Sequence, residues 1–410
     1  MPRPPRKESC ILDLFAGAGG WDEGLRALGF EARGIDSDPV ACATAEAAGH
    51  ERLVADIAAL DPAEFSGAWG LVASPPCQAY SSAGKGLGKL DKPRVLACAR
   101  ELSAGRDTRA RHLGRCEDDR SLLTVEPLRW ALALRPRWVA LEQVPAVAEL
   151  WSVFADLLGA HGYRCAFGLL SAERFGLPQV RKRAFLVASL DGAVELPTPT
   201  HRSFDPRRHK PREDELHLPR WRSMAEALGW GDEPARLRSN ITRSGQVPGG
   251  LCRSLDVPSY TVLSSSRLWR IEPCPAEPSG RGRGSQARAE RLPEACARHR
   301  DRDRSAVPPG GAPAWTHGRP ATTLLGDPRV TAPGSWPRVG RRAEIVRGRP
   351  VRINVEQASI LQGFRHDYPW QGTRTQRFEQ IGNAVPPLLA APVLAEAMRP
   401  TLDCREARRG

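Results

Sequence analysis

The chain has 410 residues, 41% of them hydrophobic, which predicts two or three domains and at least one large core. Lys and Arg number 60 against 47 Asp and Glu, and the formal net charge of +13 favours a polyanionic partner. The 10 cysteines form no Cys-x-x-Cys pair, which argues against a zinc cluster or a dense disulfide framework. No apolar run predicts a signal peptide or a membrane span, so we expect a cytoplasmic protein that contacts no membrane.

The first predicted elements form half of a nucleotide-binding βαβ unit. A buried-strand pattern at 11–15 leads into a glycine turn at 16–20, and helical spacing follows from Trp21 to Leu28. Glycines let a ligand approach the backbone, and a helix N-terminus offers unpaired N–H groups. The turn lacks Gly-x-Gly-x-x-Gly spacing, which weakens the case for a dinucleotide.

Acidic residues close the next two predicted strands. A strand at 31–35 ends at Asp36, about twenty residues beyond the glycine turn, where a carboxylate can accept the ribose hydroxyls of an adenosine. A third strand end carries Asp56, which could reach the adenine amino group. Either acid alone could be a helix N-cap, but acids at successive strand ends favour a cofactor site.

Cys77 follows another predicted strand, at 70–73. Pro75 and Pro76 fix φ near about −65° and hold the next side chain at the strand's carboxyl end, where open α/β sheets bind ligands. Most free cysteines are small buried hydrophobes, but a Pro-Pro-Cys-Gln turn is a poor place to bury a thiol. The pattern predicts a nucleophile. Residues 81–92 then read either as a mobile active-site loop or as a solvated connector.

The middle of the first lobe carries a candidate acid and two arginines. Helical patterns at 97–115 and from 118 onward precede a buried strand at 138–141, which ends at Glu142. Desolvation at such a strand end favours a protonated carboxyl, so Glu142 is a candidate acid. Before the strand at 184–188, alternation places Arg181 and Arg183 on one face, which suits a phosphate or a base carbonyl; the alternative is solvated surface.

The remainder of the chain is less regular. A short helix is expected at 221–230, and the segments 253–262 and 318–325 echo each other as strands around a variable region. Residues 272–310 contain no aromatic side chain and are predicted to be disordered. They could be a basic insert that contacts a polyanion or a damaged segment. Helices at 354–361 and 388–398 follow, with a frayed tail from Thr401.

These motifs together resemble the DNA cytosine-5 methyltransferases. Pro76-Cys77-Gln78 is similar to the family's catalytic motif, and the turn at 13–20 to its S-adenosylmethionine motif. Glu142 matches Glu-Asn-Val, although Gln143 replaces the asparagine. Gln-x-Arg-x-Arg before the strand at 184, Leu-Gln-Gly-Phe at 361 and Gly-Asn-Ala-Val-Pro-Pro at 382 complete a match over 9–189 and 318–399.

The resemblance implies a doubly wound, mostly parallel α/β sheet with a smaller inserted target-recognition lobe. We expect a catalytic and cofactor-binding lobe at 8–189, a target-recognition region at 190–345, and a C-terminal return at 346–399 that completes the catalytic lobe. Sequence specificity is expected in the inserted lobe, in the parts around 221–230 and 253–270. The segment 272–310 is expected to add sequence-independent phosphate affinity.

The resemblance also assigns roles, with no metal. The catalytic residues would be Cys77, Glu142, Arg181 and Arg183, and the DNA-binding residues Gln78, Ser81 and Gln179. S-adenosylmethionine would contact Asp13, Phe15, Gly17, Gly19, Gly20, Asp36, Ser37, Asp56, Ile57, Pro76, Asn383 and Val385. The Ser37 contact departs from the family, in which many members carry an aromatic or hydrophobic residue at that position.

The implied reaction is methyl transfer to C5 of cytosine in double-stranded DNA. We expect a monomeric modification enzyme, paired with a restriction endonuclease that acts separately. Two alternatives stay open: a tRNA cytosine-5 methyltransferase of the same fold, and a non-catalytic DNA-binding protein that retains the fold. The long variable region favours DNA over tRNA, and the intact Cys77 and Glu142 favour catalysis.

Overall fold

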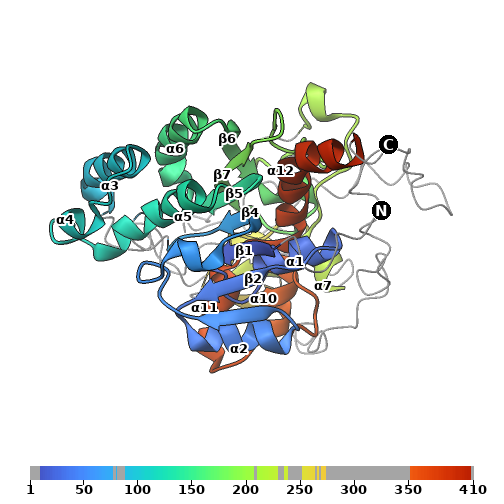
Figure 1. Cartoon of the computed structure of the whole chain (residues 1–410). Coiled ribbons are helices and arrows are strands. Elements are labelled where there is room, and N and C mark those ends of the chain that lie inside the picture. The colour runs from blue at the N-terminus through green and yellow to red at the C-terminus, as the bar shows by residue number, and fades with distance from the viewer. Residues whose placement is uncertain are drawn as a thin grey trace, which may run out of the picture.

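A seven-stranded sheet forms the centre of the computed structural model (Figure 1). Its strands are β1 (Cys10–Leu14), β2 (Arg33–Asp36), β3 (Glu51–Val54), β4 (Ala68–Ala73), β5 (Trp138–Gln143), β6 (Arg164–Ser171) and β7 (Lys182–Ser189). They lie in the order β3-β2-β1-β4-β5-β7-β6. Strands β1 to β5 are parallel, and β7 and β6 are each antiparallel to the preceding neighbour. The predicted mostly parallel, doubly wound sheet is confirmed.

The structure describes residues 10–76, 80, 88–206, 210–229, 235–238, 252–263, 266, 269–273 and 351–407. Three residues of the predicted site, Cys77, Gln78 and Ser81, lie outside these ranges. So do the predicted strand at 318–325 and nearly all of the segment 272–310.

Helices cover both faces of the main sheet. They are α1 (Gly20–Ala27), α2 (Pro39–Ala47), α3 (Gly88–Ser103), α4 (Arg109–Leu113), α5 (Glu126–Leu134), α6 (Ala148–Ala160) and α12 (Pro387–Ala407). Short 3₁₀ turns connect them at η1 (Pro62–Phe65), η2 (Asp119–Val125), η3 (Pro145–Val147) and η4 (Ala172–Phe175). The helix predicted at 97–115 is therefore two helices, and the predicted loop at 81–92 ends where α3 begins, at Gly88.

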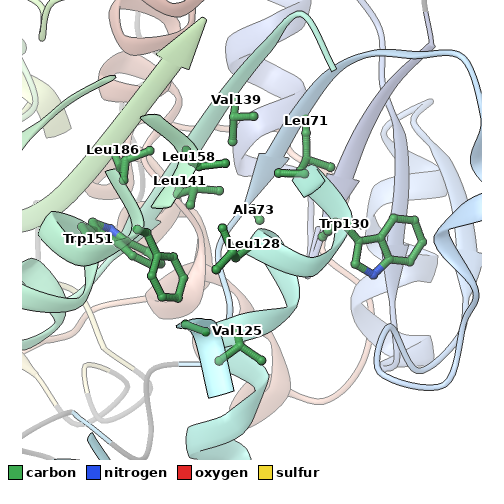
Figure 2. Packing of buried hydrophobic residues seen from close by; sticks show 14 of the residues in the cluster. Leu71, Ala73, Val125, Leu128, Trp130, Val139, Leu141, Trp151, Leu158 and Leu186 are labelled. Atoms are coloured by element: carbon green, nitrogen blue, oxygen red, sulfur yellow. The ribbon is translucent and has the colours of Figure 1, made fainter. Parts of the chain in front are cut away.

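Alternation along the central strands divides the core into two layers. In β4, Leu71 and Ala73 join one buried cluster, whereas Val72 between them joins the other. Figure 2 shows the first layer, where side chains of β4, β5 and β7 meet those of η2, α5 and α6. Its labelled members are Leu71, Ala73, Val125, Leu128, Trp130, Val139, Leu141, Trp151, Leu158 and Leu186.

Helices α1 and α12 form the second layer, on the opposite face (Figure 1). They approach closely, because a Cβ at Gly24 would lie 2.7 Å from the Ala390 Cβ. A frayed tail was expected from Thr401 onward. This expectation is wrong for residues 401–407, because helix α12 continues to Ala407. Within the described residues, the α11–α12 stretch, Arg374–Ala407, is long and apolar enough to cross a membrane. However, 67% of its most apolar 18 residues is buried inside the protein, as in the core helix of a globular domain.

A second unit is built around a four-stranded sheet in the order β11-β10-β8-β9. Its elements are β8 (Ala235–Arg238), β9 (Cys252–Ser254), β10 (Arg270–Pro273), β11 (Val351–Arg352), α7 (Met224–Leu228), α10 (Val355–Gln362) and α11 (Arg374–Asn383). The 3₁₀ turn η5 (Glu213–Glu215) precedes α7 and pairs with Arg174 of η4 through Glu215. The core of this unit joins α7, α10 and α11 to the small sheet. The predicted C-terminal return is thus divided, since α10 and α11 pack with the second unit and α12 with the main sheet.

The second sheet also shortens the predicted disordered segment. Glu272 and Pro273 belong to β10 and pair with Arg236 and Ala235 of β8. The boundary predicted at 272 therefore falls inside a strand. Strand β11 pairs with β10 through Ile271 and Val351, so the segment from 274 to 350 leaves and re-enters the same sheet at neighbouring strands.

Candidate active site

The predicted site residues gather at the carboxyl ends of the parallel strands. The glycine turn follows β1, Asp36 ends β2, Pro76 lies beyond β4, and Glu142 lies near the end of β5. Parallel strands place these ends at one edge of the sheet. Cys77, directly after Pro76, lies outside the described residues.

The glycine turn contains backbone conformations that side chains seldom adopt. Phe15 has φ +58°, Gly17 +52° and Gly19 +104°. A non-glycine residue in this region costs of order 1–3 kcal/mol and is concentrated at functional sites. Phe15 is half-buried. A Cβ at Gly17 would meet no atom within 4 Å, so the turn leaves open space there for a ligand.

Asp36 joins the glycine turn to the end of β2. Its Oδ2 accepts a hydrogen bond from the Gly17 N–H at 2.8 Å, and its Oδ1 accepts from the Asp38 N–H at 2.8 Å. Burial raises the pKa of this carboxyl, while the two backbone donors act in the opposite direction. Each oxygen retains a lone pair, so the carboxylate can still accept hydroxyl donors.

Neighbouring predicted cofactor residues differ in accessibility. Ser37 and Asp56 are exposed, Ile57 is buried, and the Asp56 Oδ1 accepts from the Ala58 N–H at 3.0 Å. Asp13 is fully buried, and within the described part of the chain no N–H or hydroxyl group donates a hydrogen bond to its oxygens. Direct contact between Asp13 and a cofactor, as predicted, does not match this placement, because the side chain is enclosed by protein.

The C-terminal motif closes against the same turn. Asn383 is the last residue of α11 and is exposed, while Val385 is buried. A Cβ at Gly20 would collide with the Val385 carbonyl oxygen and lie 2.8 Å from its nitrogen. Gly20 is therefore required for backbone contact between the first helix and the C-terminal motif.

Glu142 and Arg183 form an ion pair at the end of β5. The Arg183 Nε lies 3.0 Å from the Glu142 Oε1, and both side chains are largely buried. The same Oε1 lacks a hydrogen bond of good geometry, so the contact is electrostatic. The Arg183 Nη1 also donates to the Lys182 carbonyl at 2.8 Å, which fixes the guanidinium beside the acid.

Two side chains that the sequence analysis did not assign hold the segment before Cys77. The Gln143 Nε2 donates to the Pro75 carbonyl at 2.6 Å, and the Trp21 Nε1 donates to the Ser74 Oγ at 2.9 Å. Gln143, which replaces the family's asparagine, therefore still reaches the turn. The sequence feature that could have identified Gln143 is its place at the end of a buried strand, where a polar amide needs a hydrogen-bond partner.

Arg181 and Gln179 lie in the protein interior. Arg181 is 1% exposed and donates to three backbone carbonyls, those of Val262 (3.3 Å), Gly382 (3.0 Å) and Ala384 (3.2 Å). The Gln179 amide donates to the Leu361 carbonyl at 3.0 Å and to the Gln362 Oε1 at 2.8 Å, and it accepts from the Val262 N–H at 2.9 Å.

The contacts of Gln179 do not match its predicted role. Gln179 is fully buried with its amide used by protein atoms, so it offers no side chain to a DNA surface. Arg181 joins the entry of β7 to the second unit and to the residues that flank Asn383. Its contact with a base carbonyl stays a prediction. Their partners lie far along the sequence, which is why strand alternation alone could not identify them.

The C-5 cytosine-specific DNA methylase family matches residues 10–100, 109–232 and 280–399. The chain belongs to this family. The type II methyltransferase M.HgiDI of Herpetosiphon aurantiacus is 29% identical over 195 residues, which are 45% of this chain and 53% of that protein. M.AquIA of Picosynechococcus is 28% identical over 212 residues, 47% of this chain and 77% of that one. M1.HphI of Haemophilus parahaemolyticus is 22% identical over 406 residues, 94% of this chain and 86% of that one.

The chain thus matches about half the length of the Herpetosiphon protein. Among solved structures, the Dnmt2 methyltransferase of S. pombe aligns with a TM-score of 0.51 at 14% identity, over 96% of this chain and 99% of that one. The Entamoeba histolytica methyltransferase EhMeth aligns with a TM-score of 0.50 at 14% identity and the same coverage. At this identity the likeness supports the fold alone.

Proposed function

We propose that the protein methylates C5 of cytosine in duplex DNA, with S-adenosylmethionine as methyl donor. The observation that carries the proposal is the buried Glu142–Arg183 ion pair at the same sheet edge as the glycine turn and the Pro75–Pro76 segment. Family membership supports this reaction class, and the net charge of +13 suits a polyanionic substrate.

The residues of the cofactor half fit S-adenosylmethionine. The open space at Gly17, the lone pairs left on Asp36 and the exposed carboxylate of Asp56 suit an adenosine with its ribose hydroxyls. Asn383, Val385 and the half-buried Phe15 would border the same pocket. When bound, the cofactor supplies an electrophilic methyl group.

The chemical problem is that C5 of cytosine is a weak nucleophile. Addition of the Cys77 thiolate at C6 makes C5 enamine-like, and a proton from Glu142 to N3 prevents negative charge from accumulating on the ring. Arg183 would hold the Glu142 carboxyl in place. Once C5 carries the methyl group, a base would remove the C5 proton, the thiolate would leave from C6, and N3 would return its proton to Glu142. Because these atoms are enclosed in a duplex, the target base must be flipped out.

Trapping with 5-fluorocytosine tests this proposal. Fluorine cannot leave C5 as a proton does, so duplex DNA with this base should form a covalent complex with the wild-type protein when S-adenosylmethionine is present. Cys77→Ser should form none, and Cys10→Ser, which changes an exposed cysteine, should behave as wild type. A complex that survives in Cys77→Ser would exclude this nucleophile. Methylation of tRNA without methylation of duplex DNA would overturn the substrate assignment.

A further inference from the structure

Tyr368 belongs to the second unit, but its hydroxyl reaches the glycine turn of the first. The side chain is 4% exposed and packs in the core that includes α10 and α11. Its Oη donates to the Ala18 carbonyl at 2.5 Å. Ala18 lies between Gly17 and Gly19, so this bond fixes the middle of the turn.

Aromatic packing sets the position of the Tyr368 ring. Its centroid lies 4.7 Å from that of Phe364 and 4.8 Å from that of Trp370. The Trp370 Nε1 donates to the Ser359 Oγ at 2.9 Å, which anchors this group to α10. Since the ring is already held, the hydroxyl bonds Ala18 with little further loss of side-chain freedom.

The turn is shaped around the hydroxyl. A Cβ at Gly19 would lie 2.7 Å from the Tyr368 Oη, so only glycine allows this approach. The carbonyl and N–H of a trans peptide point in opposite directions. Fixing the Ala18 carbonyl therefore also directs the Gly19 N–H, which donates to the Ala16 carbonyl at 3.3 Å.

The Arg52 side chain also fixes the glycine turn, and Asp22 holds Arg52 in place. The Arg52 Nε contacts the Gly17 carbonyl at 3.4 Å, and the Arg52 guanidinium is held by Asp22 at 2.6 and 3.2 Å. Burial raises the pKa of Tyr368 well above its ordinary value, and the carboxylates of Glu23 and Asp22 raise it further. The hydroxyl consequently stays protonated and remains a donor throughout the physiological pH range.

We infer that Tyr368 is a positioning residue for the cofactor: through the Ala18 carbonyl it keeps the glycine turn in its binding conformation, so the second unit sets the affinity of the first for its cofactor. This inference rests on the proposed S-adenosylmethionine site. It predicts an effect on cofactor binding that is separate from any effect on the chemical step.

Tyr368→Phe tests the inference, because it removes the hydroxyl and keeps the ring. Titration calorimetry should show S-adenosylmethionine bound about 3- to 10-fold more weakly, as expected for one lost hydrogen bond. In steady-state assays the KM for the cofactor should rise by a similar factor, with kcat at saturating cofactor unchanged.

Tyr163→Phe is the matched control. Tyr163 is also 4% exposed, and its Oη donates to the Pro136 carbonyl at 2.7 Å, near the start of β5 and away from the cofactor turn. Denaturant unfolding of both variants measures how much free energy of unfolding each loses with its tyrosine hydrogen bond. Equal cofactor affinity in Tyr368→Phe and Tyr163→Phe would overturn the inference, whereas failure of the wild type to bind S-adenosylmethionine would overturn the proposed function instead.

Discussion

At the scale of single residues, Asp13 shows how the fold selects a protonation state. The carboxyl, in β1 just before the glycine turn, is fully buried. Burial raises its pKa well above the ordinary value, the nearby Asp22 carboxylate raises it further, and Arg52 partly opposes the shift. The folded state therefore binds the proton more tightly than the unfolded state does.

The sign of the resulting pH dependence follows from that shift. Stability from protonated Asp13 is fully present below the unfolded pKa and is lost as the pH rises toward the folded pKa. Asp13→Asn mimics the neutral acid, so its unfolding free energy should fall less than that of wild type between about pH 5 and pH 8. Urea titrations at several pH values measure this, with the exposed Asp403→Asn as control. Parallel pH profiles for Asp13→Asn and wild type would contradict the assignment.

The places of single residues at strand ends were predictable from nearby sequence, whereas contacts with remote partners were not. Glu142 was identified from its strand end, and Asp36 from its distance to the glycine turn. Strand alternation placed Arg181 and Arg183 together, but Arg183 contacts Glu142 of the adjacent strand and Arg181 contacts carbonyls at 262, 382 and 384. No local sequence pattern predicts that Arg181 and Arg183 contact different partners.

At the scale of elements, hydrophobic runs predicted the buried strands well. Strand β6 was missed because it is an edge strand with alternate exposed residues, among them Phe167 at 45% and Leu169 at 49%. The extension of α12 to Ala407 was missed because its last turns are held by contacts with Asp191 and with Trp69 of β4, which only the folded chain provides. Short strands of two to four residues in the second sheet carry too little periodicity to be recognised.

The contact between α1 and the C-terminal motif gives an element-scale prediction. A methyl group at Gly20 would meet backbone atoms of Val385, which cannot rotate away. Gly20→Ala should therefore lower the free energy of unfolding by about 1–3 kcal/mol, the usual cost of overpacking. Gly159→Ala should instead raise it by up to about 1 kcal/mol, because Gly159 lies in α6 and a Cβ there has no neighbour within 4 Å. Chemical denaturation measures the free energy of unfolding of both variants. An unchanged value for Gly20→Ala would show that the backbone at Val385 can move to accommodate the methyl group.

At the scale of the whole molecule, each unit extends side chains into the other. Gln179 and Arg181 extend from the first unit to the second, and Tyr368 extends back to the glycine turn. The order of strands and helices allowed the main sheet to be predicted, because parallel βα units have few topologies. The division of the C-terminal return between the units could not be predicted, since the helical patterns do not indicate which sheet each helix packs against and only tertiary contacts separate the two parts.

The second sheet also gathers positive charge in one row. Arg270 of β10 lies directly opposite Arg352 of β11 and Arg238 of β8 in the strand register. Like charges at directly opposed positions destabilise an antiparallel pair. Arg352 is exposed and Arg270 half-exposed, while Ile271, the next residue of β10, is buried. Within the part of the chain that the structure describes, neither arginine side chain forms an ion pair. A row of this kind suits the phosphate backbone of the proposed DNA substrate.

The salt dependence of DNA binding tests that row. Each phosphate contact contributes about 0.9 to the slope of log K against log salt, so Arg270→Gln with Arg352→Gln should reduce the slope by about 1.8. The methylated sequence should stay the same, because phosphate contacts carry no base information. Arg164→Gln with Arg399→Gln removes the same charge from exposed positions on β6 and α12, and should leave the slope near that of wild type. An equal loss of slope in both double variants would indicate a general charge effect, and a changed target sequence would make the row a reader of bases.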